Sequence, residues 1–129
     1  MIIHQIKVAH QDERGTISDI LQQVVVDSVT LITITKGSIR GNHYHKDSVQ
    51  YSYILSGEVI AYTQLPNQKV EKCILKAGDM LESPVMERHS LHGVDENSVL
   101  LILTKGPRGG SQYEDDTFRV PQLHEDFES

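Results

Sequence analysis

Residues 37–57 read GSIRGNHYHKDSVQYSYILSG and carry the clearest structural signal in the sequence. His43 and His45 stand two residues apart, and in an extended strand such side chains lie on the same face. Their imidazoles can therefore converge on one atom, and imidazole binds zinc, iron, nickel and copper and, less strongly, manganese. Gln50 follows after a turn-like stretch, and a glycine closes the segment at each end. The pattern predicts a polar pair of side chains held on a strand between turns.

A second stretch, residues 78–93, reads GDMLESPVMERHSLHG and adds a third histidine, His89. If His89 comes from a non-adjacent strand, it can join His43 and His45. Three imidazoles and the amide oxygen of Gln50 would leave coordination positions open for water or substrate. A His-x-His pair alone is often only a solvated or hydrogen-bonded pair, so the metal site depends on this wider frame.

Short β-rich runs separated by turn residues continue on both sides of these stretches, and no segment keeps a helical period. This rhythm predicts one all-β domain over residues 1–129, a sandwich or barrel. The expected strands cover residues 2–8, 16–26, 29–35, 50–55, 58–64, 70–75 and 98–104. Residues 106–129 are expected to form an irregular acidic tail, in which Glu114, Asp115 and Asp116 are a solvated run of charges.

The two stretches resemble the two sequence motifs of the cupin superfamily. The first fits except that Gln50 replaces a glutamate, and the second fits except at Met86 and Gly93, which replace a glycine and an asparagine. The resemblance implies an antiparallel jelly-roll β-barrel, and cupins usually form dimers. It also makes His43, His45, Gln50 and His89 the candidate metal ligands.

A narrower resemblance involves cupins that act on nucleotide sugars. DERGTI at residues 12–17 and RGNHYHK at residues 40–46 are similar to segments of sugar 3,4-ketoisomerases and of rhamnose-pathway 3,5-epimerases. VLLILT at residues 99–104 followed by YEDDTFR at residues 113–119 resembles the end of the ketoisomerases. This similarity implies that His43 is the general base and that His45 is its partner or the opposite acid. It also implies that Arg40 contacts a diphosphate and that Arg14 contacts the nucleotide, from the neighbouring subunit in one arrangement.

The chain departs from the ketoisomerases at one position that matters for the cofactor. Those enzymes need no metal, whereas this chain places His89 at the third cupin ligand position. The expected cofactor is therefore a divalent transition metal (zinc, iron, nickel or manganese), or none if the protein works as ketoisomerases do. Tyr51, Tyr53 and Arg88 are further candidates for substrate binding, with core packing as the alternative for the tyrosines and an ion pair for Arg88.

Composition limits the partners. Asp and Glu outnumber Lys and Arg by 18 to 12, which argues against non-specific binding to nucleic acid or to an anionic membrane. A small anionic ligand needs only a local cationic pocket. The single cysteine excludes an internal disulfide, and neither a signal peptide nor an apolar membrane span is visible, so a cytoplasmic protein is expected. The resemblance to cupins implies that it is a homodimer.

Three hypotheses for function remain open at this point. The leading one is an isomerase or epimerase of a nucleotide-linked keto sugar, with His43 as the base. The second is a metal-dependent cupin enzyme, a dioxygenase or an isomerase, with a site of three histidines and a glutamine. The third is a cupin that binds a small ligand without turnover.

Overall fold

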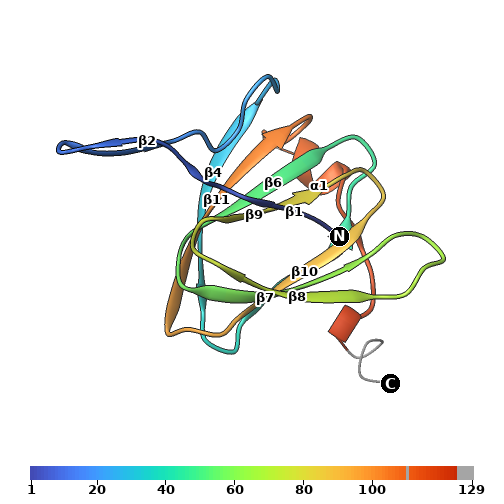
Figure 1. The fold of residues 1–129 in the computed structure, drawn as a ribbon. Coiled ribbons are helices and arrows are strands. Elements are labelled where there is room, and N and C mark those ends of the chain that lie inside the picture. Colours follow the sequence, from blue (N-terminus) through green and yellow to red (C-terminus); the bar gives the residue numbers. More distant parts are fainter. Residues whose placement is uncertain (110, 125–129) are drawn as a thin grey trace.

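Two five-stranded antiparallel sheets packed face to face form the body of the protein in the computed structural model, which describes residues 1–109 and 111–124 (Figure 1). The first sheet has the order β1 (Ile2–Gln5), β9 (Asp79–Ser83), β6 (Val49–Ser56), β11 (Asn97–Lys105) and β4 (Ser28–Thr35). The second has the order β12 (Phe118–Arg119), β5 (Ile39–Tyr44), β10 (Arg88–Gly93), β7 (Glu58–Gln64) and β8 (Glu71–Lys76). The expected all-β jelly roll is confirmed.

The N-terminal part differs from the expected strands. The run at residues 2–8 is split, because β1 ends at Gln5 and pairs with β9, while β2 (Val8–Asp12) pairs only with β3 (Gly15–Ser18). Strands β2 and β3 form an arm that stands away from the body (Figure 1). The strand expected at residues 16–26 is wrong beyond residue 18, because residues 19–27 contain no strand. The valines that suggested it include Val25, which is 68% exposed.

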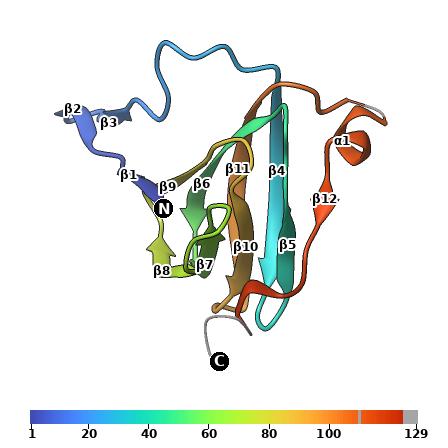
Figure 2. The ribbon, with the colours of Figure 1, turned by 90° about the vertical axis from the view of Figure 1, so that its right-hand side faces the viewer.

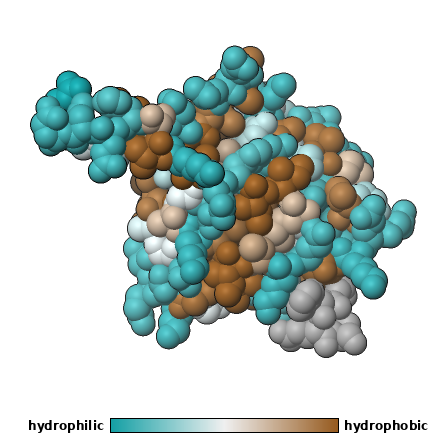
Figure 3. Space-filling model, viewed as in Figure 1, coloured by the Kyte–Doolittle hydropathy of each residue, from teal (hydrophilic) through white to brown (hydrophobic). Residues whose placement is uncertain are grey.

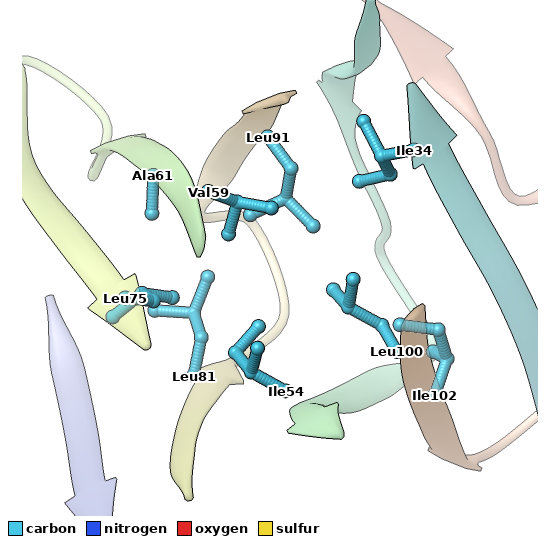
Figure 4. Close-up of a cluster of buried hydrophobic side chains, with 9 residues drawn as sticks. All are labelled: Ile34, Ile54, Val59, Ala61, Leu75, Leu81, Leu91, Leu100 and Ile102. Carbon is cyan, nitrogen blue, oxygen red and sulfur yellow. The ribbon is translucent and has the colours of Figure 1, made fainter. Parts of the chain in front are cut away.

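The hydrophobic core lies between the two sheets, where β-branched and leucine side chains from both point toward one another (Figure 4). Its members are Ile34, Ile54, Val59, Ala61, Leu75, Leu81, Leu91, Leu100 and Ile102. Strict alternation explains this placement, since every second residue of a strand faces the same side. Strand β11 shows it most clearly, because its buried residues 98, 100, 102 and 104 alternate with more exposed ones.

A close approach between β5 and β10 brings the two predicted motifs together. Gly41 has a φ of +104°, and a Cβ atom on it would lie 2.7 Å from the carbonyl oxygen of His89. Only glycine fits this position, because a side chain would collide with the β10 backbone and strain its own. Two residues later the strands place His43 opposite His89.

The C-terminal segment, residues 106–109 and 111–124, returns to the body and runs beside β5 (Figure 2). It contains the four-residue helix α1 (Gln112–Asp115) and the short strand β12. The expectation of a solvated acidic run is wrong for Asp116, which is 4% exposed. Its carboxylate accepts hydrogen bonds from the backbone N–H groups of Lys46 and Asp47 and from the hydroxyl of Ser48. The segment is therefore anchored next to the predicted histidine pair.

No helix in the described ranges, 1–109 and 111–124, has the length and apolar character needed to span a membrane.

Candidate active site

Three histidines from two neighbouring strands meet inside the barrel. His43 and His45 come from β5 and the residue after it, and His89 comes from β10. The ring of His43 lies 4.9 Å from that of His45 and 4.7 Å from that of His89, centroid to centroid. Each ring offers a nitrogen, and these three atoms lie within 4.8 Å of one another. The structure therefore brings together the three histidines that the sequence singled out.

A backbone carbonyl fixes the orientation of His45. Nδ1 of this ring lies 2.8 Å from the carbonyl oxygen of Asp116, and because a carbonyl only accepts, Nδ1 carries the proton. The other ring nitrogen, Nε2, is buried without a hydrogen-bond partner within the described residues. A buried nitrogen without a partner is costly unless something binds it.

Burial keeps two of the rings neutral. Desolvation lowers the pKa of His43 from 6.5 to about 4, and the neighbouring His45 adds to the effect. Desolvation also lowers the pKa of His89, to about 3, with smaller contributions from the other two histidines. Both rings therefore keep a free lone pair at neutral pH, as a metal ligand or a general base requires.

These residues fit a transition metal ion by their donor chemistry. Three imidazoles suit zinc, nickel, iron or manganese, and the unpartnered Nε2 of His45 is the kind of atom that such an ion would satisfy. Gln50, the predicted fourth ligand, is buried on β6 and lines the same cavity as His43 and His89. An amide oxygen in place of a carboxylate leaves this donor set uncharged.

A cavity of about 380 Å³ opens next to the histidines. Its wall combines apolar side chains from β4, β10 and β11 with polar groups, including Gln50 and Ser52 from β6. Arg40, the predicted diphosphate contact, lines it from β5, and its Nε donates to the carbonyl of Thr33. The cavity has room for a small molecule and carries a cation close to neutral imidazoles.

The C-terminal segment supplies cavity residues that the sequence analysis missed. Arg108, Tyr113 and Arg119 all line the cavity. The Tyr113 ring lies 5.5 Å from that of His45 and 6.3 Å from that of His43, centroid to centroid. No periodic pattern marks these residues, since they follow the Gly-Pro break at residues 106–107. The resemblance of YEDDTFR at residues 113–119 to the end of the ketoisomerases was a signal for Tyr113 and Arg119, but it gave neither residue a role.

Four predicted substrate-binding residues are absent from the described wall of this cavity. Arg14 sits in the β2–β3 arm, where its side chain is 81% exposed and paired with Asp12. Arg88 donates to the side chain of Gln64.

Tyr51 and Tyr53 lie on the opposite face of β6 from Gln50. Tyr51 is 9% exposed and lines a separate depression formed with residues of β1, β9 and the loop at 19–24. Alternation could have shown this, because a strand that turns residue 50 inward turns residues 51 and 53 outward.

The fold and the histidine cluster together define a cupin-type β-barrel with a small-molecule cavity. Residues 10–117 match the family described as the Polysaccharide biosynthesis C-terminal domain, and the chain belongs to this family. Among curated proteins, a probable oxalate decarboxylase of Arthroderma benhamiae is 33% identical over 76 residues. That match covers 58% of this chain and only 19% of the relative.

Solved structures with the same fold include nucleotide-sugar enzymes. The 3,4-ketoisomerase QdtA of Thermoanaerobacterium thermosaccharolyticum, in complex with TDP, has a TM-score of 0.76 and 21% identity, covering 98% of this chain and 94% of that one. The epimerase RmlC of Mycobacterium tuberculosis has a TM-score of 0.77 and 14% identity, covering 92% and 67%. The capsular polysaccharide assembling protein CapF of Staphylococcus aureus has a TM-score of 0.66 and 18% identity, covering 89% of this chain and 34% of that one. The likeness to nucleotide-sugar cupins that the sequence suggested is confirmed at the level of the fold.

Proposed function

We propose that the protein is an isomerase or epimerase that moves a proton next to the ketone of a nucleotide-linked keto sugar. The observation that carries the proposal is the juxtaposition of neutral His43 with cationic Arg40 in one cavity. Similar structures support the substrate class, because one of them is a QdtA variant in complex with TDP-4-keto-6-deoxyglucose.

The chemistry needs a base and a group that stabilises the enolate. His43 has a free lone pair in the cavity and accepts the proton from the carbon next to the ketone, while the C–H electron pair forms the enolate. To move the ketone, the enolate oxygen takes the proton of the neighbouring hydroxyl, and the imidazolium returns its proton to the former carbonyl carbon. To invert the carbon instead, a second acid must protonate the opposite face while His43 keeps the proton it took. The apolar residues Ile32, Leu91 and Ile102 limit water around this step. The ring of His45, which is 2% exposed, lies beside that of His43, with centroids 4.9 Å apart.

Deuterium exchange tests the proposal directly. Incubation with TDP-4-keto-6-deoxyglucose in D2O should label the carbon next to the ketone, and His43→Gln should slow labelling about 100-fold or more. His4→Gln is the matched control, since His4 is an exposed residue of β1 bonded to Glu82. Folded wild-type protein that binds this compound but never labels it would instead indicate a ligand-binding cupin without turnover.

A metal-dependent enzyme, a dioxygenase or isomerase, is the second candidate, and the unpartnered Nε2 of buried His45 favours it. In this proposal His43, His45 and His89 hold a divalent zinc, iron, nickel or manganese ion, with Gln50 beside them. Such an ion, when bound, polarises a substrate oxygen as a Lewis acid. Elemental analysis and titration with each ion should show one equivalent bound, and His89→Gln should weaken binding more than His4→Gln. Wild-type protein that binds none of the four ions would contradict this proposal.

We also propose that the protein forms a homodimer through the outer face of the first sheet. Val29 and Leu31 of the edge strand β4 are each 63% exposed, although both are apolar. The register aligns them in two rows across the sheet, Val29–Leu103–Tyr51 and Leu31–Leu101–Tyr53. The surface also shows apolar residues at the base of the arm and hydrophilic ones at its tip (Figure 3).

Sedimentation analysis tests this dimer. Wild-type protein should sediment at twice the chain mass of 14.5 kDa, and Leu31→Glu should yield monomers. Ile74→Glu places the same charge at another exposed apolar position, on β8 of the second sheet, and should leave the dimer intact. A wild-type monomer at micromolar concentration would rule the dimer out.

A further inference from the structure

The central cavity is cationic although the protein is acidic overall. Arg40, Arg108 and Arg119 line it, and no carboxylate side chain is among the described residues of its wall. The chain as a whole carries a formal net charge of -6. Because its histidines are neutral, the arginines set the local potential of the cavity, and that potential attracts anions.

Arg108 differs from the other two arginines in its partners. Arg119 forms an ion pair with Glu114 at 3.3 Å, and the Nε of Arg40 donates to a backbone carbonyl. The Nε of Arg108 is buried and has no hydrogen-bond partner within residues 1–109 and 111–124. Its guanidinium lies 3.9 Å from the centroid of the Tyr113 ring. Stacking on the ring holds the plane of the guanidinium, and its Nε–H still lacks an acceptor.

The backbone on either side of Arg108 and Tyr113 is held in place. The N–H of Gly106 donates to Asp27, and the carbonyl of Pro107 accepts from the hydroxyl of Ser48. Gly106 has a φ of +119°, and a Cβ atom there would lie 2.8 Å from the carbonyl oxygen of Asp47. After Tyr113, the carboxylate of Asp116 anchors the chain again. The stacked pair is thus presented to the cavity from two fixed ends, which reduces the entropy lost when it binds a ligand.

We propose that Arg108, stacked on Tyr113, binds an anionic phosphate group of the ligand beside the histidine cluster. A guanidinium binds a phosphate with two parallel hydrogen bonds, and the unpartnered Nε is one of the donors that such a fork uses. Identifying the anion as the diphosphate of a nucleotide-linked sugar rests on the proposed function. The proposal that Arg108 binds an anion does not depend on the proposed function.

Calorimetric titration with TDP, with thymidine and with inorganic pyrophosphate tests the inference. Arg108→Gln should weaken the binding of TDP and pyrophosphate about 10- to 100-fold, because a hydrogen bond to a charged group is lost. Thymidine, which lacks phosphate, should bind both proteins equally. Arg108→Lys keeps the positive charge but not the pair of parallel donors, so its affinity for TDP and pyrophosphate should lie between those of wild-type protein and Arg108→Gln. Lys105→Gln removes the same charge from an exposed residue at the end of β11 and should change nothing.

The outcomes separate this inference from the proposed function. Equal TDP affinity of wild-type and folded Arg108→Gln protein, or no binding of TDP or pyrophosphate to wild-type protein, would overturn it. If affinity is unchanged while the keto sugar is still labelled, the anion site is wrong and the isomerase stands. If affinity depends on Arg108 but no keto sugar is labelled, the anion site stands and the isomerase is wrong.

Discussion

The two halves of the barrel interior are built from the same strands yet do different work. On β6, Gln50 and Ser52 face the cavity, while Ile54, on the same side of the strand, is fully buried in the core. On β10, His89 faces the cavity, and Leu91, two residues further on, lines the cavity and also packs in the core. The division therefore falls along each strand and not between strands. Residues two or four positions apart on the same face of one strand therefore line the cavity, pack in the core or, like Leu91, do both.

The apolar half should show the largest effect on stability. Ile54→Ala removes a fully buried side chain and should lower the free energy of unfolding by about 2–5 kcal/mol, since a cavity remains. Urea unfolding of Ile54→Ala and of Ile74→Ala, an exposed position on β8, measures it. A loss below about 1 kcal/mol for Ile54→Ala would mean that this half of the barrel is not the stabilising one.

The histidine half should make the metal-free protein sensitive to acid. Between pH 6.5 and about 4, His43 is protonated in the unfolded chain but not in the folded protein. The free energy of unfolding therefore falls as the pH falls. The loss for His43 is about 3 kcal/mol, complete below pH 4 and absent above pH 7.

Unfolding in the presence of a chelator, from pH 7 to pH 4, checks the sign and the source of this effect. His43→Gln should reduce the slope without abolishing it, because the pKa of His89 is also lowered, whereas His4→Gln should leave the slope unchanged. A slope that is the same in His43→Gln and wild-type protein would show that this ring is not the group that resists protonation.

The smallest effect should come from the boundary between the two halves. Asp116→Asn weakens the hydrogen bonds to Lys46, Asp47 and Ser48 and should cost about 1–2 kcal/mol. Because the Asp116 carbonyl orients His45, labelling of the keto sugar should also slow. Asp115→Asn changes the neighbouring exposed carboxylate and should alter neither stability nor labelling. If the two variants have the same stability and the same rate of labelling, Asp116 does not support the site.

The sequence predicted the barrel and the histidine cluster because both follow from local rules. Alternation marks the strands, and His43, His45 and His89 occur at fixed spacing within two recognisable motifs. Gly41 belongs to the first motif, but the sequence does not show why a glycine is needed there. The close approach of β10 to this residue is visible only in the folded structure.

The contribution of the C-terminal segment could not be predicted in the same way. Asp116 bonds to residues about 70 positions earlier, and such a long-range contact leaves no period in a loop. Its two acidic neighbours made it look like part of a solvated run, as exposed charges usually are. Arg108 and Tyr113 lie in the same stretch of chain and were missed as cavity residues for the same reason. The outward direction of Tyr51 and Tyr53, in contrast, could have been predicted, because Gln50 on the same strand was expected to face inward.

The hydrogen bond from His45 to the Asp116 carbonyl links the ring's proton to a stretch of chain beyond the last long strand. A protease cut after Gly109 followed by release of the downstream piece would leave the ladders of β1 to β11 in place. The imidazole would then be free to turn over or to change which nitrogen is protonated. A preparation clipped in this way would look folded by circular dichroism and still have lost its chemistry.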